Sequence, residues 1–252
     1  MPTCAFCGRN DSPLSKEHVF ADWIAREFPG PDFTTFYPET GQKGYFSKNS
    51  FHLVTSKICE RCNNGWMSRL EKETKPILLP LMRASRAMLS LTDQLILSRW
   101  LVKTVTAFDL ASKRKRDCVF TADQRLSFMS TLAIPPDTQI FLAQYRGNIG
   151  EVIAFERIFF NKAETRKHLI DTHGYAATFV IGHVAMQIFT LRRGKGLIGK
   201  KLNSITQSEW LRVVNPIWPS QKPFPWPPPV LLDDVGLRLF AGRWGRAQVS
   251  IS

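Results

Sequence analysis

Two pairs of cysteines constrain this chain more than any other feature of its sequence. Cys4 and Cys7 are separated by two residues, and Cys59 and Cys62 repeat that spacing further along the chain. Two such pairs supply the four thiolates of a closed tetrahedral zinc site. We therefore predict a structural zinc site that stabilises the fold and has no open position for catalysis. The alternative reading is two independent redox pairs.

The rest of the sequence favours a reducing environment for these thiols. No apolar run approaches the roughly 18 residues of a spanning helix, and the N-terminus lacks a basic stretch followed by an apolar one. We expect a cytoplasmic protein without a membrane partner, in which thiols bind metal rather than form disulfides. Cys118, the fifth cysteine, is expected to be a small buried residue.

Charge is distributed unevenly along the chain. Of the 34 basic and 21 acidic residues, residues 1–74 carry nine of each and are formally neutral. The remainder holds 25 basic and 12 acidic residues, which is the whole excess of +13. Basic runs lie at residues 113–116 and 192–201. A basic region of this kind is typical of proteins that hold a polyanion, so we predict nucleic acid as the partner. The role of residues 76–252 stays open between DNA binding and regulation.

Residues 1–75 consist of short motifs separated by turn residues. The pattern predicts strands near residues 14–20 and 51–58, a short helix at residues 21–28 and an irregular insertion between them. Asn63 and Asn64 are expected to cap a helix that ends before Pro76.

Residues 76–252 show longer periodic segments. Apolar spacing predicts a helix at residues 92–113 and a capped helix from Thr121 to Leu132, followed by strands at 139–145, 151–160, 176–184 and 185–191. The alternating Trp and Pro near the C-terminus predict a segment that buries its indoles on a surface. We therefore predict an α+β fold, with a small zinc-bearing module at residues 1–75 and a mixed helix and antiparallel-sheet domain at residues 76–252.

Further candidate functional residues follow each cysteine pair in the sequence. Glu17 and His18 follow the first pair, and Asn63 directly follows Cys62. A carboxylate and an amide oxygen suit Mg²⁺ or another hard divalent cation. An imidazole can accept a proton from water near neutral pH. A metal and a base together are the minimum equipment for hydrolysing a phosphodiester.

This combination of residues resembles the HNH endonucleases, the ββα-metal (His-Me finger) nucleases of zinc-containing type. The resemblance covers residues 1–75 and implies a β-hairpin packed on one helix. It implies that His18 is the general base, that Glu17 and Asn63 bind the catalytic cation, and that the four cysteines bind zinc. The expected reaction is hydrolysis of DNA, most simply double-stranded, leaving a 5′-phosphate. The family more often has Asp where this chain has Glu17.

The middle position of the HNH motif is usually Asn, and two residues compete for it here. His52 is the better match and would orient His18, while Asn49 is the alternative. A strand histidine without a catalytic role is the simpler interpretation of His52. We expect His168, His173 and His183 to be structural, because none has a ligand partner at a recognisable spacing.

A zinc ribbon that binds nucleic acid or protein without cutting is the alternative for residues 1–75. A structural zinc site requires only the cysteines, so it does not explain the presence of Glu17, His18 and Asn63. Trp66 fits a core position better than a base-stacking platform, and Arg69 fits a phosphate contact and a solvated position equally well. A homodimer is compatible with cleavage of two strands, although no residue establishes it.

Overall fold

The computed structural model describes residues 2–28, 34–36, 43–45, 53–111, 119–147, 152–158, 174–191 and 216–242. The helices and strands follow in the order β1 Leu14–His18, α1 Asp22–Glu27, β2 Thr34–Phe36, β3 Lys43–Tyr45, β4 Val54–Cys59, α2 Glu60–Cys62, the π-helical segment η2 Asn63–Met67, α3 Ser68–Met82, β5 Ala87–Leu89, α4 Leu91–Ala111, α5 Ala122–Thr131, β6 Thr138–Tyr145, β7 Val152–Ile158, β8 Gly174–Ile181, β9 Val184–Leu191, β10 Pro216–Trp218, β11 Phe224–Trp226, β12 Leu231–Leu232 and α7 Asp234–Gly242. The predicted α+β class is confirmed.

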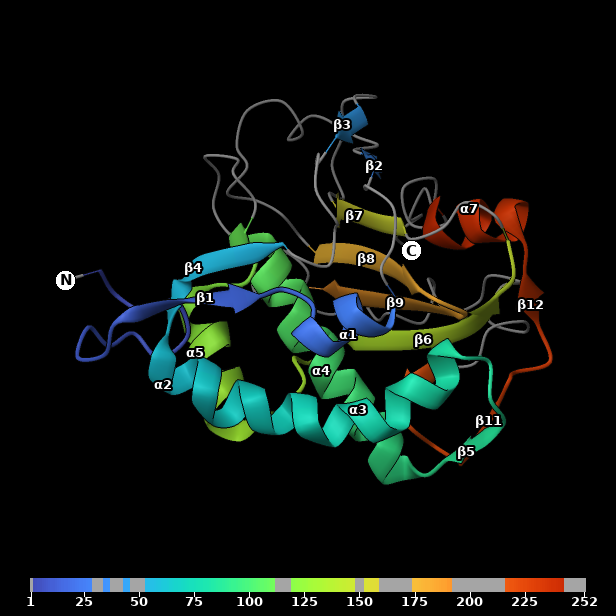
Figure 1. Cartoon of the computed structure of the whole chain (residues 1–252), viewed down its shortest axis with the longest axis horizontal. Helices are drawn as coiled ribbons and strands as arrows, with labels where there is room; N and C mark the ends of the chain where they lie inside the picture. Colours follow the sequence, from blue (N-terminus) through green and yellow to red (C-terminus); the bar gives the residue numbers. More distant parts are fainter. Residues whose placement is uncertain are drawn as a thin grey trace, which may run out of the picture.

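The larger part of the molecule is built on one sheet with the strand order β10-β6-β9-β8-β7-β2-β3, and β12 lies beside β6 (Figure 1). Strands β6, β7, β8 and β9 pair antiparallel, as the alternating pattern predicts. The turn between β8 and β9 requires Gly182. Its φ is +55°, and a Cβ there would lie 2.6 Å from the Met82 carbonyl oxygen.

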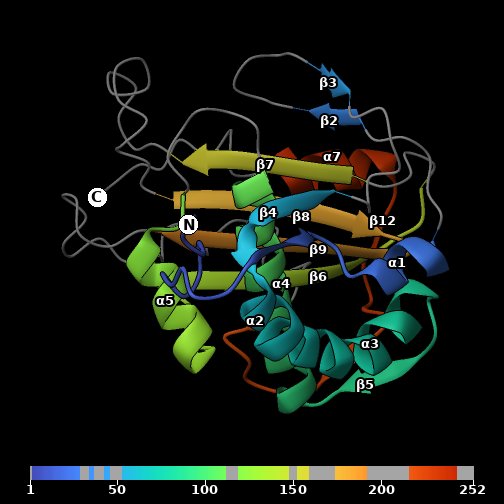
Figure 2. The same cartoon turned by 60° about the vertical axis from the view of Figure 1, so that its left-hand side comes forward.

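Alternating side chains of the sheet enter two separate cores. On β6, Ile140 and Leu142 belong to the core on the α4 side, whereas Phe141 and Ala143 belong to the core beneath α7. This alternation follows from the two-residue period of a strand. Helices therefore cover both faces of the sheet (Figure 2).

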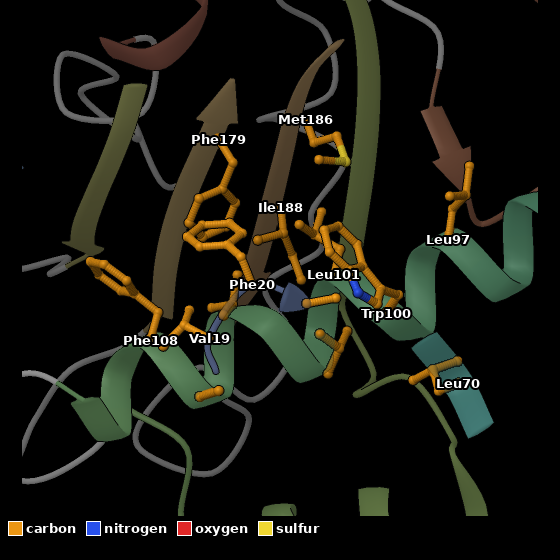
Figure 3. Close-up of a cluster of buried hydrophobic side chains, with 14 of the residues drawn as sticks. Val19, Phe20, Leu70, Leu97, Trp100, Leu101, Phe108, Phe179, Met186 and Ile188 are labelled. Atoms are coloured by element: carbon orange, nitrogen blue, oxygen red, sulfur yellow. The ribbon is translucent and has the colours of Figure 1, made fainter. Parts of the chain in front are cut away.

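Helix α4 lies between this sheet and the N-terminal elements, so both of its sides are buried. Trp100 and Phe108 of α4 face the sheet residues Phe179 and Ile188 (Figure 3). Phe20, which follows β1, packs edge-on against Phe179 with ring centroids 5.5 Å apart. The N-terminal elements and the sheet therefore share one hydrophobic core.

The N-terminal elements are an antiparallel pair of strands, β1 and β4, followed by helix. That helix differs from the prediction. Neither Asn63 nor Asn64 caps it, because it begins at Glu60. It also continues through Pro76 and Pro80 to Met82. Buried leucines at 70, 78 and 81 keep the helical spacing, and their burial outweighs the backbone hydrogen bonds that the prolines remove.

The domain boundary predicted at residue 75 falls inside α3, and it stays a prediction. Of the C-terminal segment, β10 pairs with β6 and β11 pairs with β5. Trp226 of β11 is buried, as the Trp- and Pro-rich pattern predicts. Among the described residues, no helix combines the length and apolar character needed to cross a bilayer.

Candidate metal centre and adjoining polar site

Four thiols converge where the N-terminal turn meets the end of β4. Cys4 Sγ lies 3.9 Å from Cys62 Sγ, and Cys7 Sγ lies 3.7 Å from Cys59 Sγ. All four sulfur atoms lie within 4.8 Å of one another. A tetrahedral zinc ion with Zn–S bonds of about 2.3 Å requires sulfur atoms about 3.8 Å apart. The tetrad therefore fits a closed zinc site, and the predicted convergence of the four cysteines is confirmed.

Backbone hydrogen bonds shape the turn that presents Cys4 and Cys7. The Gly8 N–H donates to the Cys4 carbonyl at 3.0 Å, and Gly8 adopts a φ of +69° that favours glycine. The Ala5 N–H donates to the Lys57 carbonyl at 2.8 Å, which joins the turn to β4. The Cys59 N–H points at Cys4 Sγ over 3.4 Å. The thiols are thus held together by the local backbone as well as by any bound ion.

The thiols differ in how readily they ionise. Contact with Cys62 lowers the pKa of Cys4 to about 4, because a thiolate at Cys4 accepts a hydrogen bond, and this outweighs its burial. The same contact, together with burial, raises the pKa of Cys62. Burial also raises the pKa of Cys7. Zinc binds thiolates, so binding must displace protons from Cys7 and Cys62.

The tetrad packs against the region that follows residue 75. Trp66 lies edge-on to Phe6 of the cysteine turn and to Phe128 of α5, with ring centroids 5.4 and 5.8 Å apart. Arg125 of α5 donates from Nε to the Ala5 carbonyl at 2.6 Å. Trp66 is buried, so its predicted core role is confirmed.

Glu17 and His18 end β1 opposite Thr55 and Val54 of β4. The pairing is irregular just before them, because Ser15 pairs with Ile58 while Glu17 already pairs with Thr55. One more residue of β4 than of β1 therefore lies in this interval, which is a β-bulge. Bulges re-aim the side chains beside them and are common next to active sites.

Glu17 is buried against a lysine from α4. Lys103 is fully buried, and its Nζ lies 2.5 Å from Glu17 Oε1, 2.7 Å from Glu71 Oε1 and 3.4 Å from the His18 carbonyl oxygen. The contact with Glu17 is an ion pair without the angles of a directed hydrogen bond. Burial raises the pKa of Glu17, and the ammonium opposes that shift. Burial disfavours the ammonium of Lys103, but the two carboxylates outweigh it and raise its pKa.

Asn63 is the first residue of η2 and lies against β1. Its Nδ2 donates to Ser15 Oγ at 3.0 Å, and Ser15 Oγ donates to the Ile58 carbonyl at 3.2 Å. The amide nitrogen is thereby used, and the amide oxygen is the atom suited to a hard cation.

The structure thus brings Glu17 to Lys103 and Glu71, and brings Asn63 to the strand that carries Glu17 and His18. Within the described part of the chain, the cysteine tetrad is the one convergence of three or more His, Cys, Asp and Glu side chains suited to a metal. Several residues singled out in the sequence lie outside the described residues, namely His52, its alternative Asn49, Cys118, His168, His173 and the basic residues of 113–116 and 192–201. His183 Nδ1 lies 3.0 Å from the Tyr145 carbonyl oxygen and donates to it, in keeping with a structural role.

Sequence reasoning missed Lys103. A signal was present in the sequence, because every other residue from Trp100 to Phe108 is apolar or a threonine. A lysine in that position needs a carboxylate partner. The sequence alone does not say which carboxylate would meet it.

Comparisons with protein-family models, with curated proteins and with solved structures found no match to this chain. The tetrad and the polar residues beside it therefore carry the functional argument alone.

Proposed function

We propose that this protein is a metal-dependent endonuclease that hydrolyses DNA phosphodiester bonds. In this proposal His18 is the general base, and Glu17 and Asn63 hold one divalent cation such as Mg²⁺. The four cysteines hold a structural zinc ion. The arrangement resembles an HNH nuclease module.

The observation that carries the proposal is the contact between Asn63 and β1. Asn63 directly follows the zinc ligand Cys62, and its amide donates to Ser15, two residues before Glu17. A cation ligand from the helix therefore lies against the strand that bears the other ligand and the base. The two paired strands followed by a helix agree with the fold that the resemblance implies.

His18 would remove a proton from water, and the water oxygen would attack the phosphorus atom. The bond from phosphorus to the 3′ oxygen then breaks, and the 3′ oxygen takes a proton from solvent water, which leaves a 5′-phosphate and a 3′-hydroxyl. A cation at Glu17 and Asn63 would neutralise the charge that develops on the phosphate and the leaving oxygen. His52 would orient His18. The excess of basic residues after residue 74 supports a DNA partner.

The test is cleavage of plasmid and linear DNA with Mg²⁺, Mn²⁺ or Ni²⁺. Wild type should cut, and His18→Ala should lose about 10² to 10⁴-fold in rate, the usual contribution of a general base. His183→Ala is a matched control, because this histidine contacts a backbone carbonyl far along the chain and should leave the rate unchanged. A His18→Ala protein that cuts as fast as wild type would refute the assignment.

One observation favours the second candidate, a zinc module that binds nucleic acid or protein without cutting. Glu17 is nearly buried and paired with a fully buried lysine, which is a structural use of the carboxylate. In that case the wild type should cut no DNA or RNA with any of the three metals, yet should still contain zinc.

A further inference from the structure

We propose that Lys103 is a positioning residue for the nuclease site, supplied by the region that follows residue 75. This inference rests on the proposed function and adds to it a residue outside the HNH-like segment. Lys103 contacts both consecutive residues to which the proposal assigns chemistry, the side chain of Glu17 and the backbone of His18.

Oxygen atoms surround the charge of Lys103. Glu17 and Glu71 place carboxylate oxygens 2.5 and 2.7 Å from Nζ, and the His18 carbonyl oxygen accepts a hydrogen bond from it over 3.4 Å. The ion pair with the ammonium is made through Glu17 Oε1. In the proposed site, the second carboxylate oxygen of Glu17 would bind the cation. Partners of this kind fix the orientation of a metal-binding carboxylate, and losing one typically costs 10- to 100-fold in affinity or activity.

The backbone that carries Lys103 is held firmly. Trp100 and Leu101 of the same helix are buried against the sheet (Figure 3). Val19 and Phe20, the two residues after His18, are buried in the same cluster. Glu17 and His18 are thus fixed from two directions, by the ammonium and by the apolar residues that follow them.

The burial of Lys103 also argues that its ion pair with Glu17 does more than stabilise the fold. Replacing a buried ion pair with apolar side chains is often neutral or favourable for stability. Lys103 keeps its charge at a fully buried position, with one of its carboxylates, Glu71, partly exposed. The geometry therefore points to a role in orienting Glu17 and His18.

The test compares Lys103→Met with Leu97→Ala in the full-length chain. Methionine keeps the length of the side chain and removes the charge. Leu97→Ala removes a buried side chain from the same helix without touching Glu17 or His18, so it controls for lost stability. Lys103→Met with Glu71→Gln is a second variant for use if the single variant unfolds. It leaves only the buried Glu17 carboxylate without its cationic partner, because glutamine at position 71 carries no charge.

Two measurements are made well below the melting temperature of each variant, and zinc content is checked throughout. The first is the rate of DNA cleavage. Lys103→Met should lower kcat 10- to 100-fold and change KM for DNA by less than about threefold. Leu97→Ala should keep kcat within about threefold of wild type. The second is the electron paramagnetic resonance spectrum of bound Mn²⁺, which should change in Lys103→Met and remain that of wild type in Leu97→Ala.

The outcomes separate this inference from the proposed function. If wild type cuts DNA and depends on His18, but Lys103→Met has the wild-type kcat and Mn²⁺ spectrum, the positioning role is wrong and the nuclease stands. If wild type cuts nothing, the nuclease proposal fails. A Mn²⁺ spectrum that requires Glu17 and changes in Lys103→Met would still support positioning, and a protein that binds no Mn²⁺ would overturn both.

Discussion

The two sides of helix α4 are stabilised in different ways. On one side, the sheet buries every residue of β8 and long runs of β6 and β9. On the other side, β1 and β4 form a sheet of two short strands, which rarely buries enough surface to be stable by itself. Docking onto α4 makes up the difference, because Val19, Phe20 and Ile24 are buried in the core that these strands share with the sheet. The cysteine tetrad adds directed bonds to this burial if it binds zinc.

Loss of the zinc site should produce the largest difference in stability between the β1–β4 region and the sheet. Structural zinc contributes about 10 to 16 kcal/mol in zinc-finger peptides, as much as the whole stability of a typical domain. Cys62→Ser should therefore remove zinc and expose the amides of β1 and β4 to hydrogen exchange, while β8 and β9 keep most of their protection. Cys118→Ser, which lies outside both pairs, should retain one zinc per chain by elemental analysis. Retention of zinc in Cys62→Ser would contradict the tetrad.

Truncation of Trp100 should instead weaken both regions together. Its side chain is fully buried in the core that they share, and removing an aromatic side chain from a core costs about 3 to 5 kcal/mol. Urea unfolding of Trp100→Ala should show this loss, and hydrogen exchange should rise in β1 and β8 alike. Faster exchange in only one of them would show that the two regions are energetically separate despite their shared core.

The affinity for zinc should rise with pH. Cys7 and Cys62 have raised pKa values and carry protons in the free protein near pH 7, whereas the thiolates that bind zinc carry none. The bound state therefore holds at least two fewer protons, and raising the pH favours it. Each pH unit should change the dissociation constant by at least about 100-fold, or about 2.7 kcal/mol. Competition with a chelator between pH 6 and 8 measures this slope, and a flat profile would contradict it.

The smallest effect is expected at the start of α5. The Thr121 side chain accepts from the Gln124 N–H, and the Gln124 side chain accepts from the Thr121 N–H, which completes a capping box. Thr121→Ala should lower the free energy of unfolding by about 1 kcal/mol, whereas Thr121→Ser keeps the hydroxyl and should lose little. Zinc content should be unchanged in both variants.

Sequence patterns predicted the parts of this fold that depend on local repetition. Strands β6 to β9, helix α4 and the capping box at Thr121 follow from period and spacing, and the cysteine tetrad follows from its two matching pairs. The short strands β5, β10, β11 and β12 were not predicted, because each exists through a partner distant in the sequence. The ion pair of Glu17 with Lys103 was missed for the same reason, since it joins residues that only the tertiary packing brings together.

The interruption of the helix at Asn63–Met67 has a consequence for how this chain tolerates insertion and deletion. Gly65 leaves the helical range there, with φ −90° and ψ −108°. A wide turn of this kind holds one residue more than an α turn, while the helical segments on either side keep their directions. Removing one residue there would allow a continuous α-helix in which Cys62 and Leu70 keep nearly the same relative orientation. A single deletion at Gly65 should thus be tolerated better than a deletion inside α3, where each lost residue turns the buried face by about 100°.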